Sequence, residues 1–331
     1  MKITVRKFTA KDTKDWDDFV NQSNNGTIFH LRSFLSYHID RKFTDHSLIF
    51  KEKGRIIALF SAAEIKNNGI KILHSHPGAS YGGFIYHKLN FGESEGILES
   101  FEQYLLEQNF NETFFIPTPS IYSHNQDETM DYALLWRKYE QVEFYISSVI
   151  TIHSDVEKNI KEVYKLKNRS KSYYEKLIQV NNISFKWEND FDTFYPILVE
   201  NKKRHNAKPT HSLEELKKIN KILPGRMNLL LMVAAGKAVG GSLIIIAKEN
   251  IGIIFYNMVD YNYLNLQPAI LQTMEVIRYA GRENLQYLDF GVSQDPKAEN
   301  PLTPSRSLIR FKEETGALTI IRKAFRKSFS F

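Results

Sequence analysis

The last third of the chain combines an acid, a glycine turn and a lysine, residue types that can accept a proton and stabilise a negative charge. A short apolar run ends in Asp289-Phe-Gly291, and a predicted helix carries Phe311-Lys312. Such a set can serve a reaction that needs a proton acceptor and a cation or hydrogen-bond donor for a developing negative charge. Lys312 is the candidate for the last role, and Asp289 can accept a proton or orient an amine. As alternatives, Lys312 is an ordinary helix-surface lysine, and Asp289 caps the turn that needs Gly291.

A polar segment upstream supplies further candidates. His205 and His211 lie between two predicted helices and are candidate general bases, because a neutral imidazole titrates near working pH. Arg204 and Lys208 can bind a diphosphate or a carboxylate. The alternative is that both histidines are only turn residues. The 15-residue segment 292–306 holds three prolines, and a loop of this length predicts a functional lid.

The periodicity of the chain predicts the elements that position these residues. In the second half, strands and helices follow in the order βααβββαβαβ, at residues 183–187, 191–206, 212 onward, 227–235, 238–248, 251–259, 269–281, 287–290, 307–314 and 317–322. The helix from residue 212 starts with a capping box, Ser212 and Glu215. The first half repeats this order less clearly, with a long helix at 94–108 and a closing strand at 142–152. A repeat of about 150 residues favours two copies of one fold. Residues 155–180 read as one long basic helix.

This order, with the Asp289-Phe-Gly291 strand end and the Phe311-Lys312 pair, resembles the FemAB-like transferases, which carry two GNAT folds in one chain. The resemblance implies an α/β fold with mixed sheets, two tandem GNAT repeats and no coiled-coil arm. It implies a first repeat at 1–152, a basic linker helix at 153–181 and a catalytic second repeat at 182–331. It further implies that Lys312 stabilises charge in the transition state and that the Phe311 carbonyl orients the amine. The substrate-binding positions that it suggests are Tyr81, Gly82, Gly83, Tyr256 and Asn257.

The acyl donor stays open at this point. Acyl-CoA-dependent GNAT enzymes usually show a Gln/Arg-x-x-Gly-x-Gly/Ala run before the long helix, and neither half has one. The resemblance implies an aminoacyl-tRNA or an acyl-CoA donor and no covalently bound cofactor. The expected activity is N-acyl transfer to a peptidoglycan peptide or a nucleotide-linked amino sugar. The alternatives are an acyl-CoA-dependent N-acetyltransferase acting on a polysaccharide amino sugar and a non-catalytic polyanion-binding protein.

Composition narrows the setting. The chain has 331 residues and no cysteine, which excludes disulfides, thiolate catalysis and Cys-based zinc sites. His74 and His76 have no third ligand in sight, so we expect no metal. No apolar run approaches the roughly 18 residues that span a bilayer, and the first residues lack a signal-peptide core. We therefore expect a cytoplasmic protein, and the resemblance implies a bacterial one, while the oligomeric state stays open.

The net charge of +6 is concentrated in two clusters. Residues 157–176 hold seven Lys/Arg against three Glu, and residues 322–331 hold four Lys/Arg and no acid. Such clusters favour a polyanion: tRNA, a nucleotide-linked substrate, coenzyme A or the surface of an anionic membrane, with peripheral contact only. The alternative is a solvated helix face followed by a frayed tail.

Overall fold

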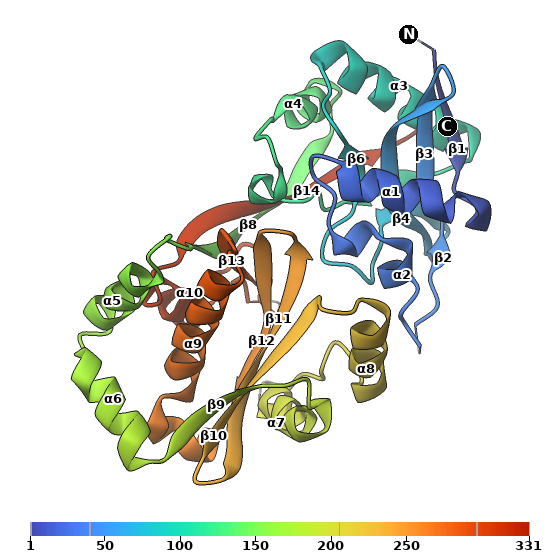
Figure 1. The fold of residues 1–331 in the computed structure, drawn as a ribbon. Coiled ribbons are helices and arrows are strands. Elements are labelled where there is room, and N and C mark those ends of the chain that lie inside the picture. Colours follow the sequence, from blue (N-terminus) through green and yellow to red (C-terminus); the bar gives the residue numbers. More distant parts are fainter. Residues whose placement is uncertain (1, 40, 205, 296, 331) are drawn as a thin grey trace. The chain divides into compact units, whose positions relative to one another are not determined.

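The computed structural model describes residues 2–39, 41–204, 206–295 and 297–330. The chain divides into two compact units (Figure 1). The N-terminal unit comprises Met1–Tyr145 and Ile321–Phe331, and the C-terminal unit comprises Ile146–Ile320. Within the described residues no helix is long and apolar enough to cross a membrane.

The N-terminal unit is a mixed sheet with helices on both faces. Its strands are β1 (Ile3–Lys7), β2 (Thr44–Asp45), β3 (Leu48–Glu52), β4 (Arg55–Asn67), β5 (Ile70–Ser75), β6 (Gly83–Tyr86) and β7 (Glu112–Phe115). Its α-helices are α1 (Thr13–Gln22), α2 (Arg32–Leu35), α3 (Phe91–Glu107) and α4 (Thr129–Trp136). Strands β1, β3, β4 and β5 pair antiparallel in that order, and β7 lies parallel to β5. Neighbouring β3 residues alternate between the faces: Ile49 packs with α1 and Phe50 with α3.

The C-terminal unit repeats this topology. Its elements are α5 (Val156–Leu166), α6 (Lys171–Val180), β9 (Ile183–Trp187), α7 (Phe191–Arg204), α8 (Leu213–Ile222), β10 (Met227–Ala234), β11 (Lys237–Lys248), β12 (Ile251–Val259), α9 (Pro268–Arg282), β13 (Tyr287–Val292) and α10 (Arg306–Glu313). Strands β9 to β12 pair antiparallel in order, and β13 lies parallel to β12. A side chain at Gly240 would meet α9, whereas one at Gly241 would meet Phe194 of α7, so the two helices cover opposite faces. The predicted α/β class and the repeated order are confirmed.

The two closing strands are exchanged relative to the sequence-based expectation. We expected 142–152 to close the first repeat and 317–322 the second. Instead, β8 (Glu140–Thr151) pairs with β13 of the C-terminal unit through Ser147–Thr151. Strand β14 (Leu318–Ser328) pairs with β7 of the N-terminal unit through Phe325–Ser328. Periodicity predicts that a segment is a strand, but it does not choose between two equivalent open sheet edges.

The basic segments also differ from expectation. The segment expected to form one helix at 155–180 is α5 followed by α6, and Ser170 caps the second helix by accepting from Tyr173 N. The C-terminal tail, for which fraying was the alternative, belongs largely to strand β14, and its four cations all form ion pairs within the N-terminal unit. These pairs are Arg322–Glu143, Lys323–Asp131, Arg326–Glu112 and Lys327–Glu102. The tail therefore offers little free positive charge to a polyanion.

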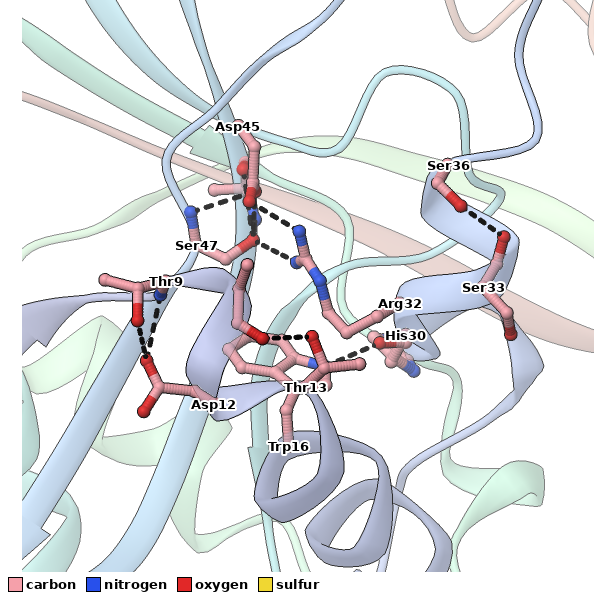
Figure 2. A network of polar contacts seen from close by, with 12 residues as sticks. Thr9, Asp12, Thr13, Trp16, His30, Arg32, Ser33, Ser36, Asp45 and Ser47 are labelled. Carbon is pink, nitrogen blue, oxygen red and sulfur yellow. Dashed lines mark hydrogen bonds and ion pairs between the residues drawn. The ribbon is translucent and has the colours of Figure 1, made fainter.

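A polar network fixes the start of α2 in the N-terminal unit (Figure 2). The Arg32 guanidinium pairs with Asp45 and donates to Ser47 Oγ at 3.1 Å. The same group lies 3.8 Å from the centroid of the Phe8 ring, a cation–π contact. The Trp16 indole donates to the His30 carbonyl at 2.8 Å. These contacts satisfy buried polar groups far from Lys312 in sequence, and we read them as structural.

Candidate active site

Asp289 lies where strands β12 and β13 separate. The parallel pairing of the two strands ends at Ile253 and Asp289, although β12 continues to Val259 and β13 to Val292. On the other side of β13, the register with β8 shifts between Asp289 and Val292. The backbone after Asp289 is thus released from its β12 neighbour and bulged against β8.

The Asp289 carboxylate is fully buried and fastens the bulge. Its Oδ1 accepts from Gly291 N at 2.6 Å and from Ser147 Oγ at 3.1 Å. Gly291 has a φ of 66°, a left-handed conformation that glycine adopts without strain. The turn-capping alternative raised for Asp289 is therefore realised in the structure. Ser147 was not singled out from sequence, because nothing local connects it to residue 289.

Lys312 is buried rather than on the helix surface. The residue is only 3% exposed, so the alternative that Lys312 is an ordinary helix-surface lysine is wrong. The ammonium donates to Gly291 O at 2.7 Å, to Val292 O at 3.1 Å and to Ser293 Oγ at 2.8 Å. These three acceptors match the three protons of an ammonium group. Burial lowers the pKa of Lys312 to about 8, and the nearby Asp289 charge acts in the opposite direction.

Ser293 is the residue of this cluster that sequence reasoning missed. It is 1% exposed, and its hydroxyl oxygen accepts from Lys312. A hydroxyl that accepts from a cation becomes a better donor through its own proton. Lys312 and Ser293 together form a charged donor unit beside the bulge. The available signal was a serine two residues after the glycine turn, which is too common to be diagnostic.

The Phe311 carbonyl is available at the end of α10. In an uninterrupted α-helix, Thr315 N would donate to the Phe311 oxygen. Here Thr315 N donates instead to Lys312 O at 3.0 Å. Among the described residues we find no donor to the Phe311 oxygen. Carbonyls in the last turn of a helix commonly lack partners. The phenyl rings of Phe311 and Phe290 meet edge to face at 6.4 Å, which fixes the lysine-bearing helix against the end of β13.

The segment 292–306 has internal order. Gln294 and Pro304 form a β-bridge, Asp295 N donates to Thr303 O at 2.8 Å, and Ser305 N donates to Ser293 O at 2.9 Å. Its base is thus tied to the residue that Lys312 contacts. In its described part, backbone contacts hold the two ends of this loop together.

The segment between α7 and α8 contributes one buried histidine. His211 is 4% exposed, and its Nδ1 lies 3.2 Å from the Tyr256 hydroxyl. Burial raises the pKa of Tyr256 to about 12, which keeps the phenol neutral. Arg204 is exposed, pairs with Glu200 at 3.6 Å and lies over the Tyr261 ring, and Lys208 is also exposed. His205 lies outside the described residues.

Asn257 is held in a buried polar network under the first turns of α9. Its amide nitrogen donates to Thr273 Oγ1 at 3.2 Å, and its oxygen accepts from Ser242 Oγ at 2.9 Å and from Gln272 Nε2 at 3.2 Å. Tyr256 and Asn257 are neighbours on β12 and therefore face opposite sides of the sheet. The structure brings Tyr256 to His211 and places Asn257 against α9, so the two do not form one contact set.

In the N-terminal unit, Tyr81, Gly82 and Gly83 have clear packing functions. Tyr81 is 5% exposed and packs against the rings of Phe29 and Tyr122. A side chain at Gly82 would clash with Ser75, and one at Gly83, whose φ is 84°, would clash with Phe115. Gly83 begins the short strand β6, which was not predicted from sequence. Among the described residues no group of three metal-ligand side chains is present.

The comparisons with known proteins agree with the fold described above. Residues 164–299 match the family model of the acetyltransferase (GNAT) domain. No curated protein matches the chain. The structure of FemX is 11% identical, with 99% of this chain and 98% of that chain covered and a TM-score of 0.69. At this identity the likeness concerns the fold.

Two further solved structures share the fold across their length. The C-terminal domain of a putative lysylphosphatidylglycerol synthetase from Agrobacterium fabrum is 8% identical, covers 97% of this chain and 93% of its own, and has a TM-score of 0.61. A tandem GNAT protein from the clavulanic acid biosynthesis pathway is 9% identical, covers 99% and 98%, and has a TM-score of 0.54. Residues 164–299 of the C-terminal unit therefore match an acetyltransferase (GNAT) domain, and the chain as a whole shares the fold of FemX and of a tandem GNAT protein.

Proposed function

We propose that this protein transfers an aminoacyl or acyl group to the amine of a cell-envelope precursor, a peptidoglycan peptide or a nucleotide-linked amino sugar. The observation that carries the proposal is the buried Asp289–Ser293–Lys312 cluster at the point where β12 and β13 separate. A preorganised positive group in a water-poor site is what a developing oxyanion requires. The envelope acceptor rests on the fold shared with FemX and with the synthetase domain.

In the proposed reaction the neutral amine nitrogen attacks the acyl carbonyl carbon. A C–N bond forms, and the carbonyl oxygen takes the negative charge of a tetrahedral intermediate. Collapse of that intermediate breaks the bond to the leaving group, a thiolate of coenzyme A or a ribose oxygen of tRNA. The amine proton passes to a base and then to the leaving group. The products are an amide and the free carrier.

The residues take distinct roles in this scheme. The three donor bonds of Lys312 are already used, so its charge reaches the oxyanion through the Ser293 hydroxyl, or directly when the ammonium releases Ser293. The Phe311 carbonyl orients the attacking amine. Asp289 holds the bulge that presents Ser293. His211 is the proposed proton acceptor in the described part of the segment between α7 and α8, and His205 keeps that candidacy from sequence.

A second candidate is an acyl-CoA-dependent N-acetyltransferase acting on a polysaccharide amino sugar. The match of residues 164–299 to an acetyltransferase domain favours this donor. The segment before α9 favours the other donor, because Gln267 and Pro268 stand where acyl-CoA enzymes usually place a glycine-rich loop. The acceptor amine and the chemistry at Lys312 are the same for both donors.

A thermal-shift comparison tests the proposal and separates the donors. We expect the melting temperature to rise with either coenzyme A or a non-hydrolysable aminoacyl-tRNA mimic, because a ligand at about 100 times its Kd stabilises the folded state by about 2.7 kcal/mol. The donor so identified, mixed with a nucleotide-linked amino sugar or a stem peptide, should yield an amide detectable by mass spectrometry. No shift with either carrier and no acylated amine would contradict the proposal.

We also propose that the basic face of α5 and α6 binds a polyanionic substrate. Three of its lysines, Lys158, Lys161 and Lys176, have no ion pair among the described residues, whereas Lys167 pairs with Glu314 at 2.6 Å. Binding of tRNA or a nucleotide-linked substrate should weaken as salt rises, because phosphate contacts release counterions. Reversal of the three unpaired charges should flatten that dependence, measured by fluorescence titration. Reversal of Lys14, an exposed lysine on α1, is the control, and an unchanged salt slope in the triple variant would contradict the prediction.

A further inference from the structure

Lys202 occupies an unusual position near the C-terminal end of α7. The two residues that follow it, Lys203 and Arg204, are exposed, but Lys202 is half-buried. Its ammonium lies 5.7 Å from the centroid of the Tyr256 ring. The Tyr256 hydroxyl in turn contacts His211, so the lysine borders the buried His211–Tyr256 pair. Sequence reasoning passed over Lys202 as one of several cations in a basic run.

The charge of Lys202 has no counter-charge in the described part of the chain. No carboxylate there forms an ion pair with it, and the neighbouring Glu200 is engaged with Arg204 at 3.6 Å. Burial lowers the pKa of Lys202, and no neighbouring charge opposes that effect. The helix C-terminus and the aromatic ring both favour a cation here, but neither neutralises it. A partly desolvated cation of this kind is costly unless a ligand supplies the missing anion.

We propose that Lys202 is the anchor of an anion subsite that binds a phosphate or carboxylate group of the acceptor. This inference rests on the proposed function, since it assigns the subsite to the acceptor of that reaction. Exposed Arg204 and Lys208, which belong to the same segment, add positive charge around the anchor. Tyr256 and His211 form its buried wall.

The arrangement favours an extended anion over a single small one. Lys202 offers one half-buried point charge, and the exposed Arg204 offers a planar fork that already stacks on Tyr261 at 4.5 Å. A diphosphate carries more negative charge than a single carboxylate, so it interacts more strongly with a half-buried cation that has further positive charge around it. Inorganic pyrophosphate should therefore bind more tightly than orthophosphate, and orthophosphate more tightly than acetate.

The test is a calorimetric titration of the full chain with inorganic pyrophosphate. We expect Lys202→Met to weaken pyrophosphate binding about tenfold or more, while the matched control Lys203→Met changes it less than twofold. The ε-carbon NMR signal of Lys202 should report a rise in its pKa when pyrophosphate binds, because an anion stabilises the charged form. Equal affinities in both variants, or a Lys202 pKa that does not respond, would overturn the assignment. Acetate and orthophosphate titrations identify which anion the subsite prefers.

The outcome is separable from that of the proposed function. Pyrophosphate binding requires no turnover. If the protein binds pyrophosphate through Lys202 but acylates no amine, the anion subsite is supported and the acyl-transfer proposal is refuted. Conversely, with an active enzyme, Lys202→Met should raise KM for an anionic acceptor and leave kcat within about twofold. A loss of kcat at unchanged KM would contradict the anchoring role and would place Lys202 in the chemical step instead.

Discussion

Replacing Lys312 with methionine should reduce acyl-transfer turnover by about a hundredfold or more. Loss of one preorganised donor or charge at an oxyanion typically costs about 3 kcal/mol of transition-state stabilisation. Methionine keeps much of the length of the lysine side chain and removes the ammonium. It also leaves the Gly291 and Val292 carbonyls and the Ser293 hydroxyl without their shared donor. The bulge that presents Ser293 should then relax, so both the charge and its relay are lost.

Stability and pH dependence separate a chemical role from a packing role. Unsatisfied buried acceptors cost about 1–3 kcal/mol, so the melting temperature of Lys312→Met should fall while the protein stays folded at 25 °C. In the wild-type protein, turnover at saturating substrates should fall as pH rises through about 8, because the ammonium loses its proton there. The residual activity of the variant should lack that descending limb.

A second lysine provides the control for this prediction. Lys14 on α1 lies outside the proposed binding face and is 85% exposed at its side chain, and Lys14→Met should leave the rate unchanged. A folded Lys312→Met protein that turns over at the wild-type rate would contradict the proposed mechanism. A second outcome is a Lys312→Met variant that is slower but whose rate still falls near pH 8. That fall would then belong to another titrating group, and Lys312 would have a purely structural function.

The sequence predicted the local order of the fold well because local periodicity determines it. The long helix expected at 269–281 is α9 at Pro268–Arg282, and Ser212 caps α8 as the Ser212–Glu215 spacing indicated. The break between α5 and α6 was missed because residues 167–170, Lys-Asn-Arg-Ser, contain neither the glycine nor the proline that usually marks the end of a helix. Short strands such as β6 were missed because four residues beside glycines carry too little pattern to distinguish a strand from a turn.

The main residues of the candidate site were named from sequence motifs, but most of the contacts between them were not predicted. Asp289, Gly291 and Lys312 were named from sequence, and the structure brings them together through Gly291 O and the Asp289–Gly291 turn. The burial of Lys312, its contact with Ser293 and the contact of Asp289 with Ser147 depend on pairing between segments far apart in the chain. Such contacts follow from tertiary packing, which a single sequence does not display.

Phe325→Ala should destabilise the N-terminal unit selectively, by about 3–5 kcal/mol, the usual cost of removing a fully buried aromatic ring. Phe325 is 0% exposed and stacks on Phe115 of β7 with 5.8 Å between ring centroids. It lies in strand β14, which sequence order alone would assign to the second repeat. The exchange of closing strands therefore predicts that a substitution near the C-terminus destabilises the N-terminal unit.

Hydrogen exchange read by mass spectrometry can locate the effect, because it reports protection element by element. In Phe325→Ala, amides of β7 and of its neighbour β5 should lose protection, while those of β10 and β11 keep it. Leu318→Ala is the matched control: Leu318 lies in the same strand but is 70% exposed, and such surface changes usually stay within about 0.5 kcal/mol. Intact protection of β7 in the Phe325 variant, or loss confined to β13, would mean that β14 closes the C-terminal unit after all. The exchanged pairing would then be wrong, and the Lys312 site, which immediately precedes that strand, would have to be rebuilt around a different sheet edge.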